Sequence, residues 1–365
     1  MAIKIGLFKM CKKYKVLFIY TCDLSQSSGG TTGTQKALKF FEENYQTEKY
    51  YINRSFSKKE IFINSLCGYL KSNRKSEKQL CQLLREKSFD ILFFDDSVNG
   101  KIIKAVKRKF PSIFIVVNFH NDETKYYKDI YISKGVLYFP LYIASKTNQK
   151  NALEYSNYRI YITDVDKKSI GETSDNYTII PALLTDSFDL KKSRNADYYL
   201  FFGFSFYAND EAVRYIINEI APKVSKRIVI AGKGMDTTFK YIDIPPNVKI
   251  IGYVDNLNSL FENAIAFICP IFSGSGMKVK IVDALMRGKT VICTDFAAIG
   301  YDKQKEVFKI CNTAQQFIDV INNQDIQSYN EYARQLFCDK YDAKKLQEYY
   351  KDIHSAYLKY KSENK

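Results

Sequence analysis

A glycine turn followed by two lysines and an acid is the part of the sequence best suited to chemistry. The segment FSGSGMKVKIVDALMRGKTVICT occupies residues 272–294. Its Gly-Ser-Gly turn lets the backbone approach a ligand closely, and the free amides of a helix that starts directly afterwards form an anion site. Lys278 and Lys280 add positive charge, whereas Asp283 lies further along the helix, where it can bind a sugar hydroxyl. The pattern predicts a site for a nucleoside diphosphate, and the alternative is an ordinary turn before a capped helix.

Positive charge is concentrated in the first third of the chain. The 365 residues carry a formal net charge of +15, and residues 1–110 hold 22 of the 55 Lys and Arg but only 10 of the 40 Asp and Glu. Two segments with helical spacing, 71–87 and 101–110, carry much of this excess. Such a face can attract an anionic membrane leaflet, a lipid phosphate or nucleic acid, and the alternative is a solvated helix surface.

The cysteines and the apolar runs exclude several classes of protein. None of the eight cysteines forms a Cys-x-x-Cys pair, which argues against a zinc site and a disulfide framework and favours a reducing cytosol. No apolar run approaches the roughly 18 residues that a membrane helix needs, and the amino-terminal segment makes a poor signal peptide. Asp164 and Asp166 have Asp-x-Asp spacing, but no such pair lies in a place suited to a metal.

Short apolar runs separated by helical stretches predict two α/β domains. The predicted strands are residues 14–22, 89–96, 112–122, 158–164 and 177–181, then 198–204, 227–232, 247–254, 264–270 and 290–295. Polar residues 181–197 form the best candidate linker, and Asn209 is predicted to cap a helix of the second half. The alternation of strands and helices indicates doubly wound sheets. Ligands of such sheets bind at the carboxyl ends of the strands, so we expect a cleft between two domains.

The second half of the sequence resembles the GT-B glycosyltransferases, in particular the GT4-like families (glycosyl transferases group 1). The run CPIFSGSGMKVKIVDALMRGKTVICTDFAAIGYD is similar to their nucleotide-sugar site, and YYLFFGFSFYANDEAVRYIINEIAPKV, IVIAGKG and VKIIGYVDNLNSLFENAIAFICP are similar to the units before it. The resemblance is strong over 198–301 and weaker in the N-terminal half. It implies an α/β fold with two Rossmann-like doubly wound domains, residues 1–188 on the acceptor side and 189–340 for the nucleotide-sugar. A C-terminal helix, 341–365, would cross back to the N-terminal domain.

The same resemblance implies donor-binding roles for residues in both halves. They are Gly30, Gly203, Ser205, Tyr253, Val254, Ser275, Gly276, Met277, Lys280 and Asp283. The amides of 275–277 would bind the donor phosphates, and Asp283 stands where a glutamate normally binds the ribose. Residues 271–273 depart from the pattern, because they offer no carboxylate where many members have one.

His120 and Lys278 are the implied catalytic residues. His120 lies in NFHNDE, where many relatives have a His-Asn-x-Glu signature facing the donor sugar, and the implied role is a hydrogen bond to that sugar or polarisation of the leaving phosphate. The alternative is a histidine that is merely hydrogen-bonded at a strand end. Glu123 is a secondary candidate, and the only other histidine, His354, is expected at the surface of a polar helix.

The resemblance implies a glycosyltransferase that moves a sugar from a nucleotide-diphosphate sugar to an acceptor hydroxyl, with retention and without a metal or other cofactor. The implied partners are a glycan or lipid-linked acceptor and an anionic membrane surface that contacts the basic first domain. The implied setting is the cytoplasm or the inner face of the membrane, in bacterial surface polysaccharide or glycolipid assembly. The alternative is a catalytically weak GT-B protein that binds nucleotide-sugar or scaffolds partners. An epimerase of this fold would carry more acidic and histidine residues in the cleft, and a nucleic-acid binder would carry a recognition motif that we do not find.

Overall fold

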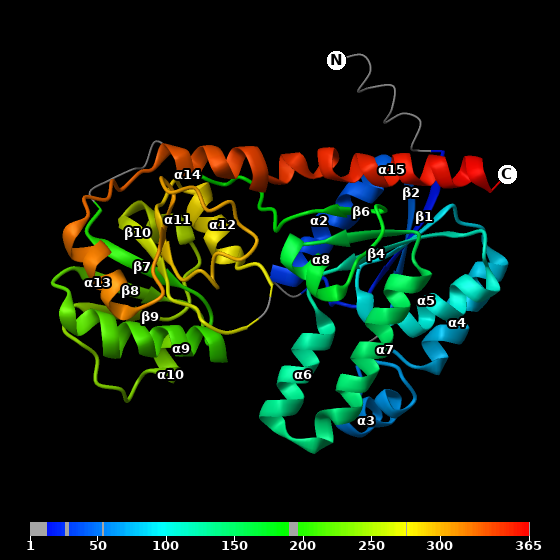
Figure 1. The fold of residues 1–365 in the computed structure, drawn as a ribbon, viewed down its shortest axis with the longest axis horizontal. Helices are drawn as coiled ribbons and strands as arrows, with labels where there is room; N and C mark the ends of the chain where they lie inside the picture. Colours follow the sequence, from blue (N-terminus) through cyan, green and yellow to red (C-terminus); the bar gives the residue numbers. More distant parts are fainter. Residues whose placement is uncertain (1–12, 26–28, 53–54, 190–195, 275, 365) are drawn as a thin grey trace, which may run out of the picture. The chain divides into compact units, whose positions relative to one another are not determined.

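The chain folds into two compact units, each built on one parallel sheet. The computed structural model describes residues 13–25, 29–52, 55–189, 196–274 and 276–364. Unit 1 comprises Met1–Ile180 and Leu346–Lys365, and unit 2 comprises Pro181–Lys345. Each unit contains a six-stranded sheet with helices packed on it (Figure 1). Because every pair of neighbouring strands is parallel, the carboxyl ends of the strands in each unit lie along one edge.

The sheet of unit 1 has the order β2-β1-β3-β4-β5-β6. Its strands are β1 (Lys15–Tyr20), β2 (Gln46–Tyr51), β3 (Ile91–Phe94), β4 (Phe114–Phe119), β5 (Tyr158–Tyr161) and β6 (Tyr177–Ile179). Its helices are α2 (Gly29–Asn44), α3 (Lys58–Leu66), α4 (Arg74–Glu86), α5 (Gly100–Lys109), α6 (Glu123–Lys134), α7 (Phe139–Tyr155), α8 (Asp164–Ile170) and α15 (Leu346–Glu363), with 3-10 turns η1 (Ser97–Asn99) and η2 (Val136–Tyr138).

The central strands of unit 1 are mostly apolar because helices cover both faces of the sheet. Leu17 and Leu92 point to one face, where they join a buried cluster that includes Ile102 and Val106 of α5. Phe18 and Phe93 point to the other face, where their rings stack 4.9 Å apart. Residues in alternate positions along a strand therefore build the two halves of the core.

The sheet of unit 2 has the order β12-β11-β10-β7-β8-β9. Its strands are β7 (Tyr198–Phe202), β8 (Arg227–Ala231), β9 (Val248–Ile251), β10 (Ala264–Cys269), β11 (Val291–Cys293) and β12 (Phe308–Ile310). Its helices are α9 (Tyr207–Tyr215), α10 (Met235–Thr238), α11 (Leu257–Glu262), α12 (Val279–Met286), α13 (Ala314–Asn323) and α14 (Glu331–Leu336), with short turns η4 (Ile216–Ile220), η5 (Ala221–Lys223), η6 (Phe337–Tyr341) and η7 (Ala343–Lys345).

The ten strands predicted from the sequence are all present, and the structure adds two. The added strands, β2 and β12, lie at sheet edges. β2 reads QTEKYY and is largely exposed, so it lacks the apolar run that identifies a central strand. Gly30, which the resemblance implies as a donor-binding residue, lies within α2, as does Gly33.

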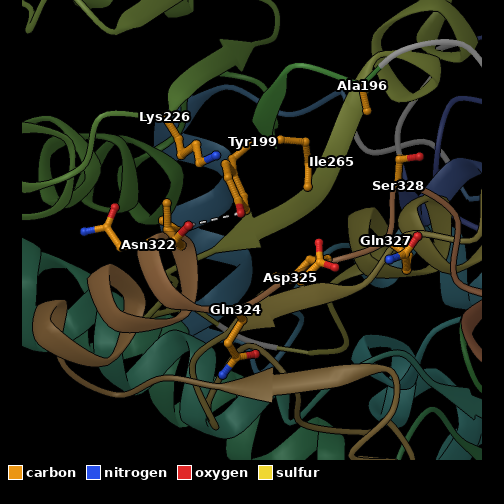
Figure 2. Close-up of a pocket in the computed structure, with 11 residues that line it drawn as sticks. Ala196, Tyr199, Lys226, Ile265, Asn322, Gln324, Asp325, Gln327 and Ser328 are labelled. Carbon is orange, nitrogen blue, oxygen red and sulfur yellow. Dashed lines mark hydrogen bonds between the residues drawn. The ribbon is translucent and has the colours of Figure 1, made fainter.

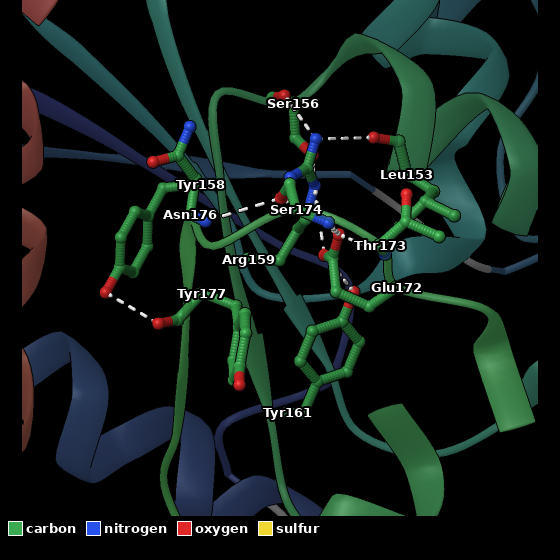
Figure 3. A network of polar contacts seen from close by, with 10 residues as sticks. All are labelled: Leu153, Ser156, Tyr158, Arg159, Tyr161, Glu172, Thr173, Ser174, Asn176 and Tyr177. Atoms are coloured by element: carbon green, nitrogen blue, oxygen red, sulfur yellow. Dashed lines mark hydrogen bonds and ion pairs between the residues drawn. The ribbon is translucent and has the colours of Figure 1, made fainter. Parts of the chain in front are cut away.

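A buried polar network fixes the end of the unit 1 sheet that contains β5 and β6 (Figure 3). Arg159 of β5 donates to Ser174 Oγ at 2.6 Å and to the Leu153 carbonyl at 2.9 Å, and its Nε lies 3.5 Å from Glu172 Oε2. Glu172 also accepts a 2.7 Å hydrogen bond from the Tyr161 hydroxyl. Its several donors, together with the Arg159 charge, lower the pKa of Glu172 although burial alone raises it.

Candidate functional site

The predicted glycine loop follows β10 at the carboxyl edge of unit 2. Gly274 and Gly276 have φ values of 102° and 65°, which place both in the left-handed region that favours glycine. Helix α12 begins at Val279, two residues later than Met277, and Lys278 occupies the N-cap position. A lysine ammonium cannot accept an amide proton, so this side chain leaves the first-turn amides of α12 uncapped. The Met277 side chain is buried, and its sulfur accepts the Ala182 amide at 3.4 Å.

Lys280 is held against neutral groups at this edge. Its Nζ donates to Asn209 Oδ1 at 2.5 Å and lies 4.7 Å from the centre of the Phe201 ring. Among the described residues, no carboxylate forms an ion pair with this ammonium. Burial, with a smaller contribution from the nearby Lys278, lowers the pKa of Lys280 to about 8. A desolvated cation without an anion is costly, and a bound anion would remove that cost.

The loop after β7 makes room for Lys280. A Cβ at Gly203 would lie 2.5 Å from Lys280 Nζ, so only glycine fits without displacing the ammonium. Asn209 was predicted as an N-cap, and this prediction is wrong. It lies inside α9, where its Oδ1 accepts from Lys280 and its Nδ2 donates to the Phe204 carbonyl at 2.7 Å. Asn209 is a site residue that sequence reasoning missed, because its polar type at a helix start had already suggested a cap.

Ser205 connects the β7 loop to the neighbouring loop after β8. Its hydroxyl lies 2.8 Å from Thr238 Oγ1 and donates to Asp210 Oδ1 at 3.0 Å. Its amide donates to the Lys233 carbonyl at 2.8 Å. The structure therefore brings Gly203, Ser205 and Lys280 together, because β10, β7 and β8 are consecutive in the sheet.

The remaining predicted residues of unit 2 lie around this group. Lys278 Nζ donates to the Gly276 carbonyl at 2.8 Å, and it lies 4.8 Å from the Phe296 ring centre. Tyr253 and Val254 follow β9, one strand beyond β8, and Tyr253 is exposed. Ser275 lies outside the described residues.

Asp283 is engaged by an arginine that the sequence did not single out. Arg287, one turn later on α12, donates to Asp283 Oδ1 at 3.0 Å and to Asn258 Oδ1 at 2.9 Å. The Arg287 side chain is 5% exposed, so the pair is largely removed from water. The i,i+4 spacing of Asp283 and Arg287 was the available signal. This contact holds one oxygen of the Asp283 carboxylate toward Arg287.

In unit 1, His120 lies directly after β4 and contacts the end of β3. Its Nε2 is 2.7 Å from the Asp95 carbonyl oxygen and 3.5 Å from Asp95 Oδ1, and the side chain is 28% exposed. Burial on its own lowers the pKa of His120, but the charges of Asp95 and Asp96 outweigh it and raise the pKa to about 9. His120 is therefore a cation at neutral pH, and it can donate from both ring nitrogens. Gly30 lies in the first turn of α2 in the same unit.

Polar groups at the same edge of unit 1 lack partners. The described part of the chain provides no hydrogen bond for Ser97 Oγ, Asn99 Oδ1, Asn118 Oδ1 or Asn121 Oδ1, although these atoms are buried. Such atoms normally have a partner, so this edge suits a polar ligand or water. Ser97 and Asn99 follow β3. Asn118 lies on β4, two residues before His120. Sequence reasoning missed the two residues after β3 because a serine and an asparagine in a turn carry no specific signal.

His354 was expected at the surface, and this expectation is wrong. The side chain is buried at 5% exposure, with Nδ1 lying 3.3 Å from the Tyr45 hydroxyl. Burial lowers the pKa of His354. It belongs to the core contact of α15 and has no access to a ligand.

A separate pocket of about 570 Å³ lies at the opposite edge of the unit 2 sheet (Figure 2). Its lining includes Ala196, Tyr199 and Ile265, which stand at the amino ends of β7 and β10. The Tyr199 hydroxyl donates across it to the Ile321 carbonyl at 3.4 Å. Because the strands are parallel, this pocket is distinct from the glycine-loop edge. Within the described residues no group of His, Cys, Asp and Glu is arranged to hold a metal ion, and none of the described helices has the length and apolarity needed to cross a bilayer.

Comparison with known proteins gives a family match and a set of similar folds. Residues 196–323 match the family model for glycosyl transferases group 1. An uncharacterized 44.6 kDa protein in the cps region of Klebsiella pneumoniae is 25% identical over 338 residues, which cover 85% of this chain and 86% of that protein.

The similar structures share the two-sheet architecture at low sequence identity. The apo form of the lipopolysaccharide outer core galactosyltransferase WaaB has a TM-score of 0.65 at 14% identity, covering 94% of this chain and 99% of that one. HepE of Anabaena in complex with UDP-glucose has a TM-score of 0.64 at 10% identity, covering 94% and 100%. At these identities the likeness shows the fold, which is GT-B, and the predicted fold class is confirmed.

Proposed function

Because the chain carries the group 1 glycosyltransferase domain over residues 196–323 and has the GT-B fold, we propose that it transfers a sugar from a nucleotide-diphosphate donor to an acceptor hydroxyl. The observation that carries this proposal is Lys280, a desolvated ammonium held by Asn209 and the Phe201 ring with no described carboxylate as partner. A donor diphosphate supplies the missing negative charge. The uncapped start of α12 and the Lys278 ammonium lie beside it.

The proposed chemistry places charge stabilisation in unit 2. As the bond from the sugar to the diphosphate breaks, negative charge grows on the leaving oxygens, and Lys278, Lys280 and the amides of 276–277 stabilise it. Asp283 would accept from the ribose hydroxyls. Tyr253 and Val254 would contact the base.

The proposed role of His120 is to donate a hydrogen bond to the sugar or to the leaving phosphate during turnover. Its raised pKa, about 9, keeps it a donor at neutral pH. We infer retention of configuration from the group 1 pattern, and a surface glycan or glycolipid as the acceptor. The relative in the cps region of Klebsiella pneumoniae supports this setting.

The direct test combines nucleotide binding with a donor screen. Titration of UDP, GDP and ADP by calorimetry should give a binding isotherm for at least one of them, and incubation with the matching sugar donors and lipid-linked or glycan acceptors should give a product of increased mass. Absence of binding to every nucleotide diphosphate would overturn the proposal.

A second candidate function is a nucleotide-sugar-binding protein with little catalysis. The Asp283–Arg287 contact favours it, because that ion pair ties one oxygen of the expected ribose-binding acid to the protein. Nucleotide binding without product from any donor and acceptor would support this candidate. An Arg287→Gln variant that gains nucleotide affinity would show that the ion pair restrains the acid.

Replacement of His120 by alanine separates its proposed role from nucleotide binding. We expect turnover to fall by roughly 100-fold or more, since acid-base or hydrogen-bond assistance is typically of that size. UDP or GDP affinity should change little, because the residue is assigned to the sugar end of the donor. Equal losses of turnover and nucleotide affinity would contradict this assignment.

A further inference from the structure

Large apolar side chains are exposed together on three α-helices and one 3-10 turn of unit 1. They belong to α3, to the end of α6, to η2 and to the start of α7. The set, which we name the apolar tip, is Phe62, Ile63, Leu66, Ile132, Val136, Leu137, Phe139 and Ile143, with exposures from 40% to 75%. Figure 1 shows α6 and α7 running side by side away from the sheet, with α3 next to α7. Single exposed apolar residues are ordinary, but a contiguous group marks an interaction surface.

The members of the apolar tip are spatial neighbours as well as similar in type. A pocket of about 570 Å³ opens between them, with Ile61 and Phe62 of α3 on one side and Leu137, Tyr138 and Leu141 on the other. Tyr131 packs against Phe139 with ring centroids 5.3 Å apart, which joins the end of α6 to the start of α7. The tip is therefore one surface rather than a scatter of side chains.

Exposed lysines are frequent on the helices that carry the apolar tip. They are Lys58, Lys59, Lys125, Lys128, Lys134, Lys146 and Lys150. The exposed acids on the same helices are Glu60, Asp129 and Glu154. Glu60 is engaged in the capping box of α3, where it accepts the Ser57 amide at 2.8 Å. These helices therefore expose seven lysines against three acids, which makes their surface cationic.

The basic helices that the sequence singled out are less available than their charge suggests. In α5, Lys107 donates to the Ile113 carbonyl at 2.8 Å, and Lys104 and Arg108 lie over the Tyr155 ring at 5.2 and 5.8 Å. Lys101 lies 4.2 Å from the Tyr69 ring centre. These contacts engage the cations of α5 within unit 1, so α5 is less available to an anionic partner than its charge suggests.

An apolar tip on lysine-rich helices matches the interface of an anionic bilayer. Exposed apolar side chains enter the boundary between headgroups and acyl chains, lysines contact lipid phosphates, and tyrosines such as Tyr131 and Tyr138 lie at headgroup level. A protein partner fits less well, since lysine is depleted in protein interfaces. We propose that the apolar tip docks unit 1 on a bilayer of anionic lipid, with Val136 and Leu137 inserted and the lysines of these helices on the phosphates. The inference stands apart from the donor chemistry of unit 2.

The absence of tryptophan from the sequence gives a direct test. A Leu137→Trp variant carries a single indole at the tip, and its emission should shift to the blue when vesicles containing phosphatidylglycerol are added. A Tyr241→Trp variant places the indole at a 90% exposed position of unit 2 and should not shift. No shift at position 137, or an equal shift at both positions, would overturn the proposal.

Charge and insertion are tested separately by vesicle flotation. The double variant Val136→Asp, Leu137→Asp should lose binding to phosphatidylglycerol vesicles by about 100-fold, since two apolar side chains leave the interface and two charges enter it. Lys125→Glu with Lys128→Glu should weaken binding on the order of 10-fold or more. The matched reversal Lys75→Glu with Lys78→Glu, on exposed positions of α4, should have a smaller effect. Loss of binding only in the α4 variant would overturn the assignment of the surface.

Two controls keep these outcomes decisive. The tip variants should keep the wild-type melting temperature and UDP affinity, which separates loss of docking from loss of folding or of the proposed donor site. Light scattering tests the alternative that the apolar tip binds a second copy of this protein. A dimer that disappears in the Val136→Asp, Leu137→Asp variant, together with no vesicle binding by the wild type, would assign the tip to self-association and overturn the proposal.

Discussion

At the scale of single residues, the environment of Lys280 is the most informative feature of unit 2. Its ammonium contacts an amide oxygen and an aromatic face, and both contacts are weaker than a full ionic partner. Gly203 leaves the space that the ammonium occupies, and Asn209 holds it in place. Such a cation suits a bound anion, because no carboxylate among the described residues pairs with it.

Removal of this charge should be felt in nucleotide binding. We expect Lys280→Met to lower UDP or GDP affinity by about 10- to 100-fold, because a charge-assisted hydrogen bond contributes roughly 1.5 to 3 kcal/mol. Lys233→Met is the matched control, since Lys233 is exposed in the adjacent loop after β8. Calorimetric titration compares the two variants, and equal losses would remove Lys280 from the proposed site.

The lowered pKa of Lys280 predicts a pH dependence with a defined sign. Because its pKa in the free protein is about 8, mainly through burial, the charged form is lost as the pH rises through 8. Diphosphate affinity should therefore fall above pH 8. The contribution of the same lysine to folding stability should rise over that range, because the unfolded lysine holds its proton up to a higher pH.

A charge that does not titrate provides the control for this prediction. In Lys280→Arg the cation persists above pH 8, so any remaining affinity should become nearly independent of pH in this range. Nucleotide titrations at several pH values measure both effects. A wild-type affinity that is constant from pH 7 to pH 9 would contradict the assignment.

At the scale of secondary-structure elements, the Arg159 network shows how the last strands of unit 1 are fixed. β5 and β6 pair over only three residues, from Arg159 to Tyr161, so their backbone contact is short. Arg159 connects β5 to the end of α7 and to the turn before β6 through Leu153, Ser156 and Ser174. The hydrogen bonds of the Arg159 guanidinium therefore help to hold β5 and β6 in place, beyond what the three-residue strand pairing provides.

Loss of this guanidinium should destabilise unit 1. Arg159→Ala leaves the Glu172 side chain, 3% exposed, without its cation, and we expect a cost of about 3 kcal/mol or more. Arg227→Ala removes a cation from an exposed pair with Asp197, whose side chains are 59% and 50% exposed, and should cost about 1 kcal/mol or less. Urea unfolding followed by circular dichroism compares the variants. Similar midpoints for both would show that the network contributes little.

At the scale of the whole molecule, the chain returns to unit 1 after completing unit 2. Helix α15 packs Tyr350 against Phe40 of α2, with stacked rings 4.5 Å apart, and Tyr357 donates to Asp90 Oδ1 at 2.7 Å. These contacts are separated by about three hundred residues in the sequence, so unit 1 is completed only when its last segment is present.

The stability of unit 1 should therefore depend on its last helix. We expect Tyr350→Ala to lower the free energy of unfolding of unit 1 by about 3 to 5 kcal/mol, as for other buried aromatic residues. Leu358→Ala, at a position 38% exposed on the same helix, should cost about 1 kcal/mol. Thermal unfolding measures the difference. If the unfolding transition of unit 1 is unchanged in Tyr350→Ala, packing of α15 contributes little to the stability of this unit.

The sequence by itself determined the central strands, the fold class and the glycine turn after β10. Apolar runs such as residues 264–269 and 91–94 identify buried parallel strands because both of their faces are covered. The Gly-x-Gly turn also carries its own signal, since Gly274 and Gly276 need φ values that other residues avoid. A local sequence pattern is therefore enough to predict a feature when that feature requires particular residue types at its own positions.

Only the tertiary structure decided which residues surround those motifs and which surfaces stay exposed. The edge strand β2 pairs with β1 through the backbone, and this pairing does not require an apolar run. The sequence of β2 therefore did not identify it as a strand. Asn209 contacts Lys280, which is 71 residues away in the sequence, and the packing of α15 against the rest of unit 1 buries His354. The lysines of α5 contact aromatic rings and carbonyl oxygens. Each outcome depends on contacts between segments distant in sequence, and neither residue type nor local spacing specifies such contacts.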